Sequence, residues 1–135
     1  MTLRLTRHQW QTIAEHLTRE LPNEACGLLG GRGGVVEKVF LIENRWRSPV
    51  RYEMEPTAQI QAMVAIEDAG LEITAIFHSH PAGPAIPSST DVAEAYYPEA
   101  LYLICAPHER NQWQGRAFYI QNGQCTEVPV LIANS

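Results

Sequence analysis

A chain of 135 residues, 45% of them hydrophobic, has the size and composition of one ordinary folded domain, so we expect a single domain over residues 1–135. Its formal net charge of -5 argues against a protein that binds nucleic acid through a broad basic face. There is no apolar targeting segment near Met1, and no apolar run approaches the ~20 residues of a membrane span. We therefore expect a cytoplasmic protein with neither nucleic acid nor membrane as a partner.

The first predicted element is a helix that Thr6 can cap at its N-terminus. Trp10, Ile13 and Leu17 follow the spacing of three and four residues that marks one buried helix face. The helix should end before Pro22, because proline does not fit the interior of a helix.

A glycine-rich hairpin is predicted next. The short apolar run over residues 25–31 is bounded by glycines and indicates a strand, and Gly33-Gly34 supplies the turn to a partner strand over residues 35–43. Residues 44–56 contain two prolines and lack a helical period. They predict an extended loop or a segment at a sheet edge.

A second helix should begin with Thr57 as its cap and end at Gly70, since glycine commonly terminates helices. The side chains expected to mark its turns are Ile60, Met63, Val64 and Glu67.

The rest of the chain reads mainly as strands. Residues 73–77 are apolar or neutral at every position, as expected for a central strand covered on both faces. The pattern then predicts a rigid proline-rich loop, a short helix over residues 89–96, and strands over residues 100–106, 114–120 and 124–130. The predicted class is α/β (α+β), with a mixed, largely antiparallel sheet flanked by helices.

Two histidines follow the predicted central strand at metal-ligand spacing. His78 and His80 are two residues apart, so they point to the same face about 6–7 Å apart along the backbone. Ser88 and Asp91 follow in the stretch HSHPAGPAIPSSTD. Two imidazole nitrogens and one carboxylate leave a fourth tetrahedral position for water, so we expect one catalytic Zn²⁺ per chain. Taken alone, Ser88-x-x-Asp91 is a helix capping box, and Ser88 can serve both purposes.

The stretches HSHPAGPAIPSSTD and EACGLLGG resemble the metal motif and the glutamate-bearing strand of the JAMM, or MPN-plus, metallopeptidases. The order of elements is similar to the compact prokaryotic members of that family. The resemblance implies a cytidine-deaminase-like JAMM/MPN fold and an isopeptidase or metallopeptidase activity. It also implies that Glu24 is the general acid and base, with Ser88 stabilising the oxyanion. Residue chemistry alone leaves open that Glu24 is a solvated carboxylate at a helix end.

The same resemblance implies a substrate class, namely ubiquitin-like or sulfur-carrier proteins cleaved after a C-terminal Gly-Gly tail. Arg45, Trp46, Arg47 and Arg51 lie in the predicted loop and are candidates for binding this partner. The alternative is that these arginines form a solvated loop face. The sequence leaves the oligomeric state open, with a homodimer as one option.

Four other functions can be weighed against this interpretation. A non-catalytic MPN-type scaffold needs no open metal position, and a generic small-peptide zinc hydrolase needs no carrier protein. A RadC-like protein usually carries an N-terminal DNA-binding segment that this sequence lacks. A zinc nucleobase deaminase is discarded because the chain has no Pro-Cys-x-x-Cys ligand pair.

The remaining cysteines and histidines receive structural interpretations. The three cysteines are odd in number and widely spaced, so we expect reduced, partly buried thiols, with Cys105 in the core. The histidines outside the motif have no carboxylate partner at ligand spacing and are expected at the surface. These cysteines and histidines are Cys26, Cys105, Cys125, His8, His16 and His108.

Overall fold

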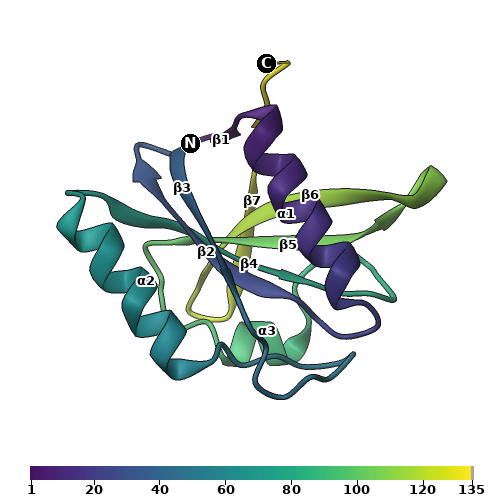
Figure 1. The fold of residues 1–135 in the computed structure, drawn as a ribbon. Coiled ribbons are helices and arrows are strands. Elements are labelled where there is room, and N and C mark those ends of the chain that lie inside the picture. The colour runs from purple at the N-terminus through teal and green to yellow at the C-terminus, as the bar shows by residue number, and fades with distance from the viewer. Residues whose placement is uncertain (135) are drawn as a thin grey trace.

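The computed structural model describes residues 1–134, and within that range the strands form one eight-stranded sheet with three α-helices packed around it (Figure 1). The helices are α1 (Arg7–Glu20), α2 (Pro56–Asp68) and α3 (Ser89–Ala93), with a short 3-10 turn at Glu109–Asn111. The strands are β1 (Leu3–Leu5), β2 (Cys26–Arg32), β3 (Val35–Ile42), β4 (Glu72–Ser79), β5 (Leu101–His108), β6 (Gln112–Gln121), β7 (Gln124–Val128) and β8 (Val130–Ile132).

The strands lie in the order β7-β6-β5-β4-β2-β3-β1-β8. Strand β2 is antiparallel to β3 and β4, and β6 is antiparallel to β5 and β7, whereas β4 runs parallel to β5. The mixed, largely antiparallel sheet predicted from the sequence is therefore confirmed. This order places β4, which contains His78 and ends just before His80, in the middle of the sheet.

The last two strands lie at opposite ends of this strand order, although only Pro129 separates them in the chain. Strand β7 pairs with β6, and β8 pairs with β1, where the N–H of Leu3 donates to the carbonyl oxygen of Pro129 at 2.9 Å. The single strand predicted over residues 124–130 is thus wrong. Proline cannot donate a backbone hydrogen bond, and the chain changes its partner strand at this residue.

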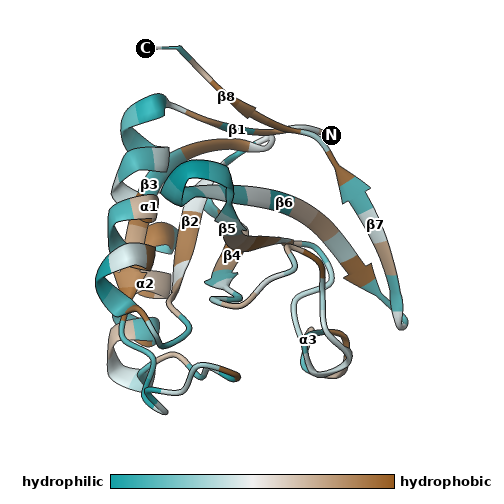
Figure 2. Ribbon diagram, turned by 90° about the vertical axis from the view of Figure 1, so that its right-hand side faces the viewer, coloured by the Kyte–Doolittle hydropathy of each residue, from teal (hydrophilic) through white to brown (hydrophobic). Residues whose placement is uncertain are grey.

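Strand β4 contributes side chains to a hydrophobic core on each face of the sheet. Phe77 lies in one core with Leu17 of α1, and Ile76 lies in the other core with Ile66 of α2. The predicted central strand covered on both faces is confirmed. Figure 2 shows that β5, which pairs with β4, is strongly hydrophobic, whereas much of α1 is hydrophilic.

The predicted helix caps are right for α1 and wrong for α2. The Thr6 hydroxyl accepts a hydrogen bond from the N–H of Gln9 at 3.0 Å, as a capping residue should. In α2 the cap is Glu55, whose carboxylate accepts from the N–H groups of Thr57 and Ala58 at 3.1 and 2.7 Å. Pro56 takes the first helical position, where its missing N–H leaves no hydrogen bond unmade.

The buried face of α2 also differs from the prediction. Ala62 and Ile66 are buried. A Cβ atom added to Gly30 of β2 would lie 2.9 Å from Cγ1 of Ile66, so the glycine allows the helix to approach the sheet closely. The contact with the sheet is therefore made by Ala62 and Ile66 and not by the side chains that were expected to mark the turns. Of the predicted side chains, Met63 is partly buried, and Ile60, Val64 and Glu67 are exposed.

Two further expectations need correction. Helix α3 ends at Ala93, before the predicted residue 96, and the N–H of Tyr97 donates to the Tyr102 hydroxyl at 3.0 Å instead of continuing a helix. The cysteines are free and Cys105 is buried as predicted, but Cys125 is exposed on β7, a strand in which only Val128 is buried. No helix formed by residues 1–134 is both long enough and apolar enough to cross a membrane.

Candidate active site

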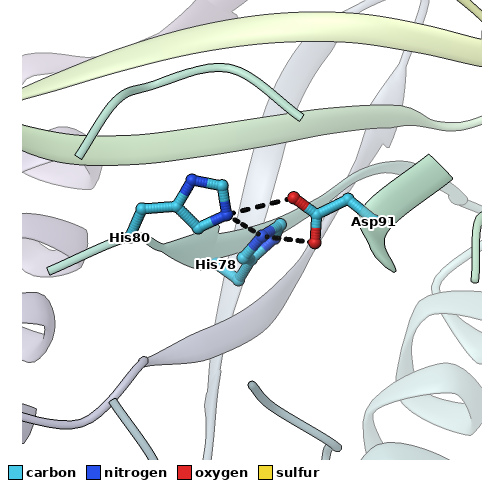
Figure 3. Close-up of side chains that lie close together, drawn as sticks. All are labelled: His78, His80 and Asp91. Carbon is cyan, nitrogen blue, oxygen red and sulfur yellow. Dashed lines mark hydrogen bonds and ion pairs between the residues drawn. The ribbon is translucent and has the colours of Figure 1, made fainter. Parts of the chain in front are cut away.

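Three predicted metal ligands meet at the C-terminal end of β4. His78 lies within β4, His80 follows it, and Asp91 projects from the first turn of α3 (Figure 3). The Nε2 atoms of the two histidines are 3.1 Å apart. Nε2 of His78 lies 3.1 Å from one carboxylate oxygen of Asp91, and Nε2 of His80 lies 3.0 Å from the other.

This triangle of ligand atoms fits a metal ion. Ligand atoms from the three residues lie within 4.8 Å of one another. Donors about 2.0–2.1 Å from a tetrahedral ion lie roughly 3.3 Å apart, close to the separations seen between His78, His80 and Asp91. The donor set of two imidazoles and one carboxylate is also the type that leaves room for a further ligand.

Neighbouring backbone groups fix the orientation of two of these side chains. Nδ1 of His80 lies 2.8 Å from the carbonyl oxygen of Pro84, and because a carbonyl oxygen only accepts, Nδ1 is the donor. In the neutral imidazole Nε2 then carries a lone pair that faces the site. The N–H of Ser88 donates to the Asp91 carboxylate at 2.8 Å. The proline-rich loop and the residue that follows it thus orient both ligands.

The protonation states of His78 and Asp91 favour metal binding, whereas at His80 burial is outweighed by hydrogen bonds with Asp91 and Pro84, which raise its pKa. Burial lowers the pKa of His78, so its imidazole is neutral near neutral pH. Burial works to raise the pKa of Asp91, but hydrogen bonds with His78 and His80 outweigh it and hold the pKa well below its ordinary value. A neutral imidazole and an ionised carboxylate are the forms that bind a metal ion.

Glu24 lies just before β2, and its side chain is buried, with the whole residue only 5% exposed. Burial, together with the negative charge of Asp91, raises the pKa of Glu24 to about 7, while the nearby His80 works in the opposite direction. A carboxyl group that titrates near neutral pH can both accept and donate a proton. The solvated carboxylate considered from the sequence is therefore wrong, because the strand pairing draws Glu24 into the protein.

A cavity of about 560 Å³ connects these groups. Glu24, His78, Ser88 and Asp91 all line it. Much of the rest of the cavity lining is apolar or aromatic, as in many substrate pockets. The apolar and aromatic lining residues are Leu28, Trp46, Val50, Tyr52, Met54, Met63, Ile73, Ile76, Tyr96, Tyr97 and Tyr102.

Ser88 caps α3 and also faces the cavity. Its hydroxyl oxygen accepts a hydrogen bond from the N–H of Asp91 at 3.1 Å, and the Asp91 carboxylate accepts one from the N–H of Ser88. The capping box predicted from the sequence is confirmed. Because the hydroxyl oxygen accepts this bond, its own O–H can still donate to a group in the cavity.

The four candidate substrate-binding residues divide into two pairs. Trp46 and Arg51 line the cavity, with the Arg51 guanidinium 5.0 Å from the centre of the indole ring. The Arg45 guanidinium lies 5.2 Å from the centre of the same ring. Neither Arg45 nor Arg47 lines the cavity. Each of these two forms an ion pair with a glutamate. The pairs are Arg45 with Glu53 at 3.7 Å and Arg47 with Glu43 at 2.8 Å.

The loop that carries these residues folds back on itself instead of forming an edge strand. An isolated antiparallel bridge joins Asn44 to Met54. Asn44 is buried, and its side chain donates to the carbonyl oxygens of Glu24 and Arg51, each at 3.0 Å. Asn44 was missed from the sequence, because an asparagine before a charged loop gives no local signal of such long-range contacts.

Ser79 and Tyr52 are two further site residues that the sequence did not reveal. The Ser79 hydroxyl accepts a hydrogen bond from the N–H of Ala25, the residue after Glu24, at 2.8 Å. The Tyr52 ring stacks on the His78 imidazole, with ring centres 4.5 Å apart. The only available signal for Ser79 was its place between the two histidines.

The histidines outside the motif do not join the site. His8 and His108 are exposed, as predicted. His16 is buried, which corrects its assignment to the surface, and its Nε2 lies 3.2 Å from the carbonyl oxygen of Cys26. The cause is the packing of α1 on the sheet, which also brings the imidazole edge against Phe77.

Comparisons with known proteins agree with this geometry. The family described as prokaryotic homologs of the JAB domain matches residues 6–118. A Thermus thermophilus protein named "Probable TtuB-protein conjugate cleaving protease" is 42% identical over 132 residues, covering 97% of this chain and 84% of the relative. A Mycobacterium tuberculosis protein named "CysO-cysteine peptidase" is 37% identical, covering 89% of this chain and 84% of the relative. A Pyrococcus furiosus desampylase is 46% identical, covering 81% and 76%.

Solved structures share the fold. A solution structure of a Desulfitobacterium hafniense protein has a TM-score of 0.87 and 35% identity, covering 100% of this chain and 94% of that chain. A JAB1/MPN domain protein from Archaeoglobus fulgidus has a TM-score of 0.59 and 21% identity, covering 95% and 98%, and shows the fold alone. The resemblance seen in the sequence is thus confirmed: the chain belongs to the family of prokaryotic JAB-domain homologs and is a hydrolase of the JAMM metallopeptidase type.

Proposed function

We propose that this chain is a zinc metallopeptidase that cleaves the amide bond after the C-terminal Gly-Gly tail of a ubiquitin-like or sulfur-carrier protein. The observation that carries the proposal is the shared cavity, because Glu24 lines it together with His78 and Asp91. A proton carrier, a metal-binding triangle and space for a substrate then coincide. The names of the relatives support the substrate class, since one is named a CysO-cysteine peptidase and another a probable TtuB-protein conjugate cleaving protease.

The proposed metal is one zinc ion per chain, held by His78, His80 and Asp91. Two imidazole nitrogens and one carboxylate oxygen suit zinc and leave its fourth tetrahedral position open. When bound, zinc would polarise a carbonyl oxygen and lower the pKa of water to about 7.

Glu24 and Ser88 have complementary proposed roles in amide hydrolysis. Glu24 accepts a proton from the attacking water and then donates it to the leaving amine, and its pKa of about 7 suits both steps near neutral pH. The Ser88 hydroxyl donates a hydrogen bond to the negatively charged oxygen that develops on the scissile carbonyl. This role is compatible with its capping bond, in which the same oxygen is an acceptor.

The loop with Trp46 and Arg51 is the proposed docking site for the carrier protein. An extended tail can enter the cavity past these side chains, and a narrow path would admit glycine residues and exclude larger ones. Arg45, Arg47 and Arg51 would face acidic groups on the carrier, which offsets the negative charge of the chain itself. The proposed location is the cytoplasm, where free cysteines remain reduced.

A cleavage assay with two carrier proteins tests the proposal. The zinc-loaded protein is incubated with a sulfur carrier ending in Gly-Gly-Cys and with a matched variant ending in Gly-Ala-Cys, and products are read by mass spectrometry. We expect release of cysteine from the first carrier and much slower release from the second, with no release after chelation of the metal. Cleavage of short peptides alone would favour a generic peptide hydrolase, and a metal-free, inactive protein would favour a scaffold.

A further inference from the structure

The two histidines of the candidate metal site are oriented by different means. His80 has its Nδ1 atom 2.8 Å from the carbonyl oxygen of Pro84. Nδ1 of His78 is buried and has no hydrogen-bond partner among residues 1–134. Because a histidine that binds a metal usually donates its other ring N–H to an acceptor, His78 lacks the common device for fixing its ring.

An aromatic ring lies where it can replace that device. The side chain of Tyr52 stacks on the His78 imidazole, with ring centres 4.5 Å apart and planes inclined by 24°. His78 is only 1% exposed, and Tyr52 lines the same cavity as the imidazole. A stacked neighbour restricts the rotation and tilt of the ring that it covers.

The backbone on both sides of Tyr52 is held in place. The side chain of Asn44 donates to the carbonyl oxygen of Arg51 at 3.0 Å and accepts from the N–H of Glu53 at 3.2 Å. Asn44 is itself 2% exposed, and it also donates to the carbonyl oxygen of Glu24 at 3.0 Å. The ring of Tyr52 is therefore presented to His78 by a fixed segment and not by a free loop tip.

We propose that Tyr52 is a positioning residue for the metal site, which orients the His78 imidazole by stacking instead of by a hydrogen bond. The inference rests on the metal site of the proposed function. It assigns the effect to the aromatic ring of Tyr52, not to its hydroxyl group. Orientation of His78 then depends on the loop that contains Asn44 and Tyr52, whereas orientation of His80 depends on the proline-rich loop.

Zinc affinity, measured by competition with a chromophoric chelator, tests this assignment without any substrate. Tyr52→Leu and Tyr52→Met remove the ring, and we expect each to weaken zinc binding by about 10- to 100-fold, the usual effect of losing a group that orients a metal ligand. Tyr52→Phe keeps the ring and should stay within about threefold of the wild type. Tyr97→Leu is the matched control, because Tyr97 lines the same cavity without stacking on a ligand.

The outcomes separate this inference from the proposed function. Wild-type affinity in both Tyr52→Leu and Tyr52→Met would overturn the positioning role alone, and equal losses in Tyr52→Phe and Tyr52→Leu would assign the effect to the hydroxyl and overturn the stacking argument. If Tyr52→Leu does not fold, as judged by circular dichroism, Tyr52→Met and Tyr52→Phe carry the comparison. A wild-type protein that binds no zinc would overturn the proposed metal site and this inference with it.

Discussion

The backbone N–H of Ala25 donates to the Ser79 hydroxyl at 2.8 Å, and the N–H of Ser79 donates to the carbonyl oxygen of Ala25 at 3.0 Å. Ala25 follows Glu24 in the chain, and Ser79 separates His78 from His80. Both Ala25 and Ser79 are completely buried. The pair therefore ties Glu24, the proposed proton carrier, to the strand segment that holds His78 and His80 through two hydrogen bonds.

Replacing Ser79 tests this connection. In Ser79→Ala the buried N–H of Ala25 loses its partner, so the free energy of unfolding should fall by about 1–3 kcal/mol. We also expect kcat to fall while zinc stays bound, because Glu24 is no longer held in place. The wild type is the reference in urea denaturation and turnover assays. Unchanged stability and turnover in Ser79→Ala would show that the hydrogen bond has no positioning role.

The metal ligands can be tested by zinc analysis of purified variants. His78→Ala and His80→Ala each leave two protein ligands, which rarely hold a catalytic zinc ion, so both should contain little zinc. His8→Ala is a matched control, since His8 is exposed on α1 and distant from the motif in sequence. Full zinc occupancy in both ligand variants would rule out this ligand assignment.

The two roles of Ser88 can be separated by two substitutions. Ser88→Ala removes the cap and the hydroxyl, and Ser88→Gly removes the hydroxyl but lowers cap stability by only a few tenths of a kcal/mol. If Ser88 stabilises the oxyanion, both variants should lose about 10²- to 10³-fold in kcat. Thermal unfolding distinguishes them, because Tm should fall in Ser88→Ala and remain nearly unchanged in Ser88→Gly. A folded Ser88→Gly with wild-type kcat would limit Ser88 to capping.

The raised pKa of Glu24 predicts a pH dependence of stability in the metal-free protein. The folded state binds this proton more tightly than the unfolded state, because the pKa rises from 4.5 to about 7 on folding. The free energy of unfolding should therefore fall as the pH rises from 4.5 to 7, and it stays lower above that range. Glu24→Gln removes this loss, so at pH 8 it should be more stable than the wild type by about 1–3 kcal/mol. If the difference in the free energy of unfolding between Glu24→Gln and the wild type is the same at pH 8 as at pH 4, then folding does not raise the pKa of Glu24.

The metal triangle could be predicted because its geometry is local. Strand alternation places His78 and His80 on one face, and a short proline-rich loop returns the chain to Asp91. Glu24 is different, since its burial depends on the pairing of Cys26 with His78 between β2 and β4. Its role came from the family resemblance, because residue spacing alone gives no measure of that pairing.

Other parts of the site depend on contacts that no local pattern encodes. The stacking of Tyr52 on His78 requires the loop to fold back through the side chain of Asn44. The burial of His16 requires α1 to pack against β2. Hydrophobic periodicity correctly predicted most strands, but it failed for the buried face of α2, where Gly30 leaves the space that Ile66 occupies against the sheet.

Turnover by Glu24→Gln tests the proposed zinc hydrolase most directly. The amide preserves the shape of the side chain but cannot carry the proton, so the variant should fold, bind one zinc ion per chain and lose about 10²- to 10⁴-fold in turnover of a carrier ending in Gly-Gly-Cys. Zinc content and cysteine release are measured on the same preparation, with the wild type alongside. Near-wild-type release of cysteine by zinc-loaded Glu24→Gln would contradict the role of Glu24 as the proton carrier.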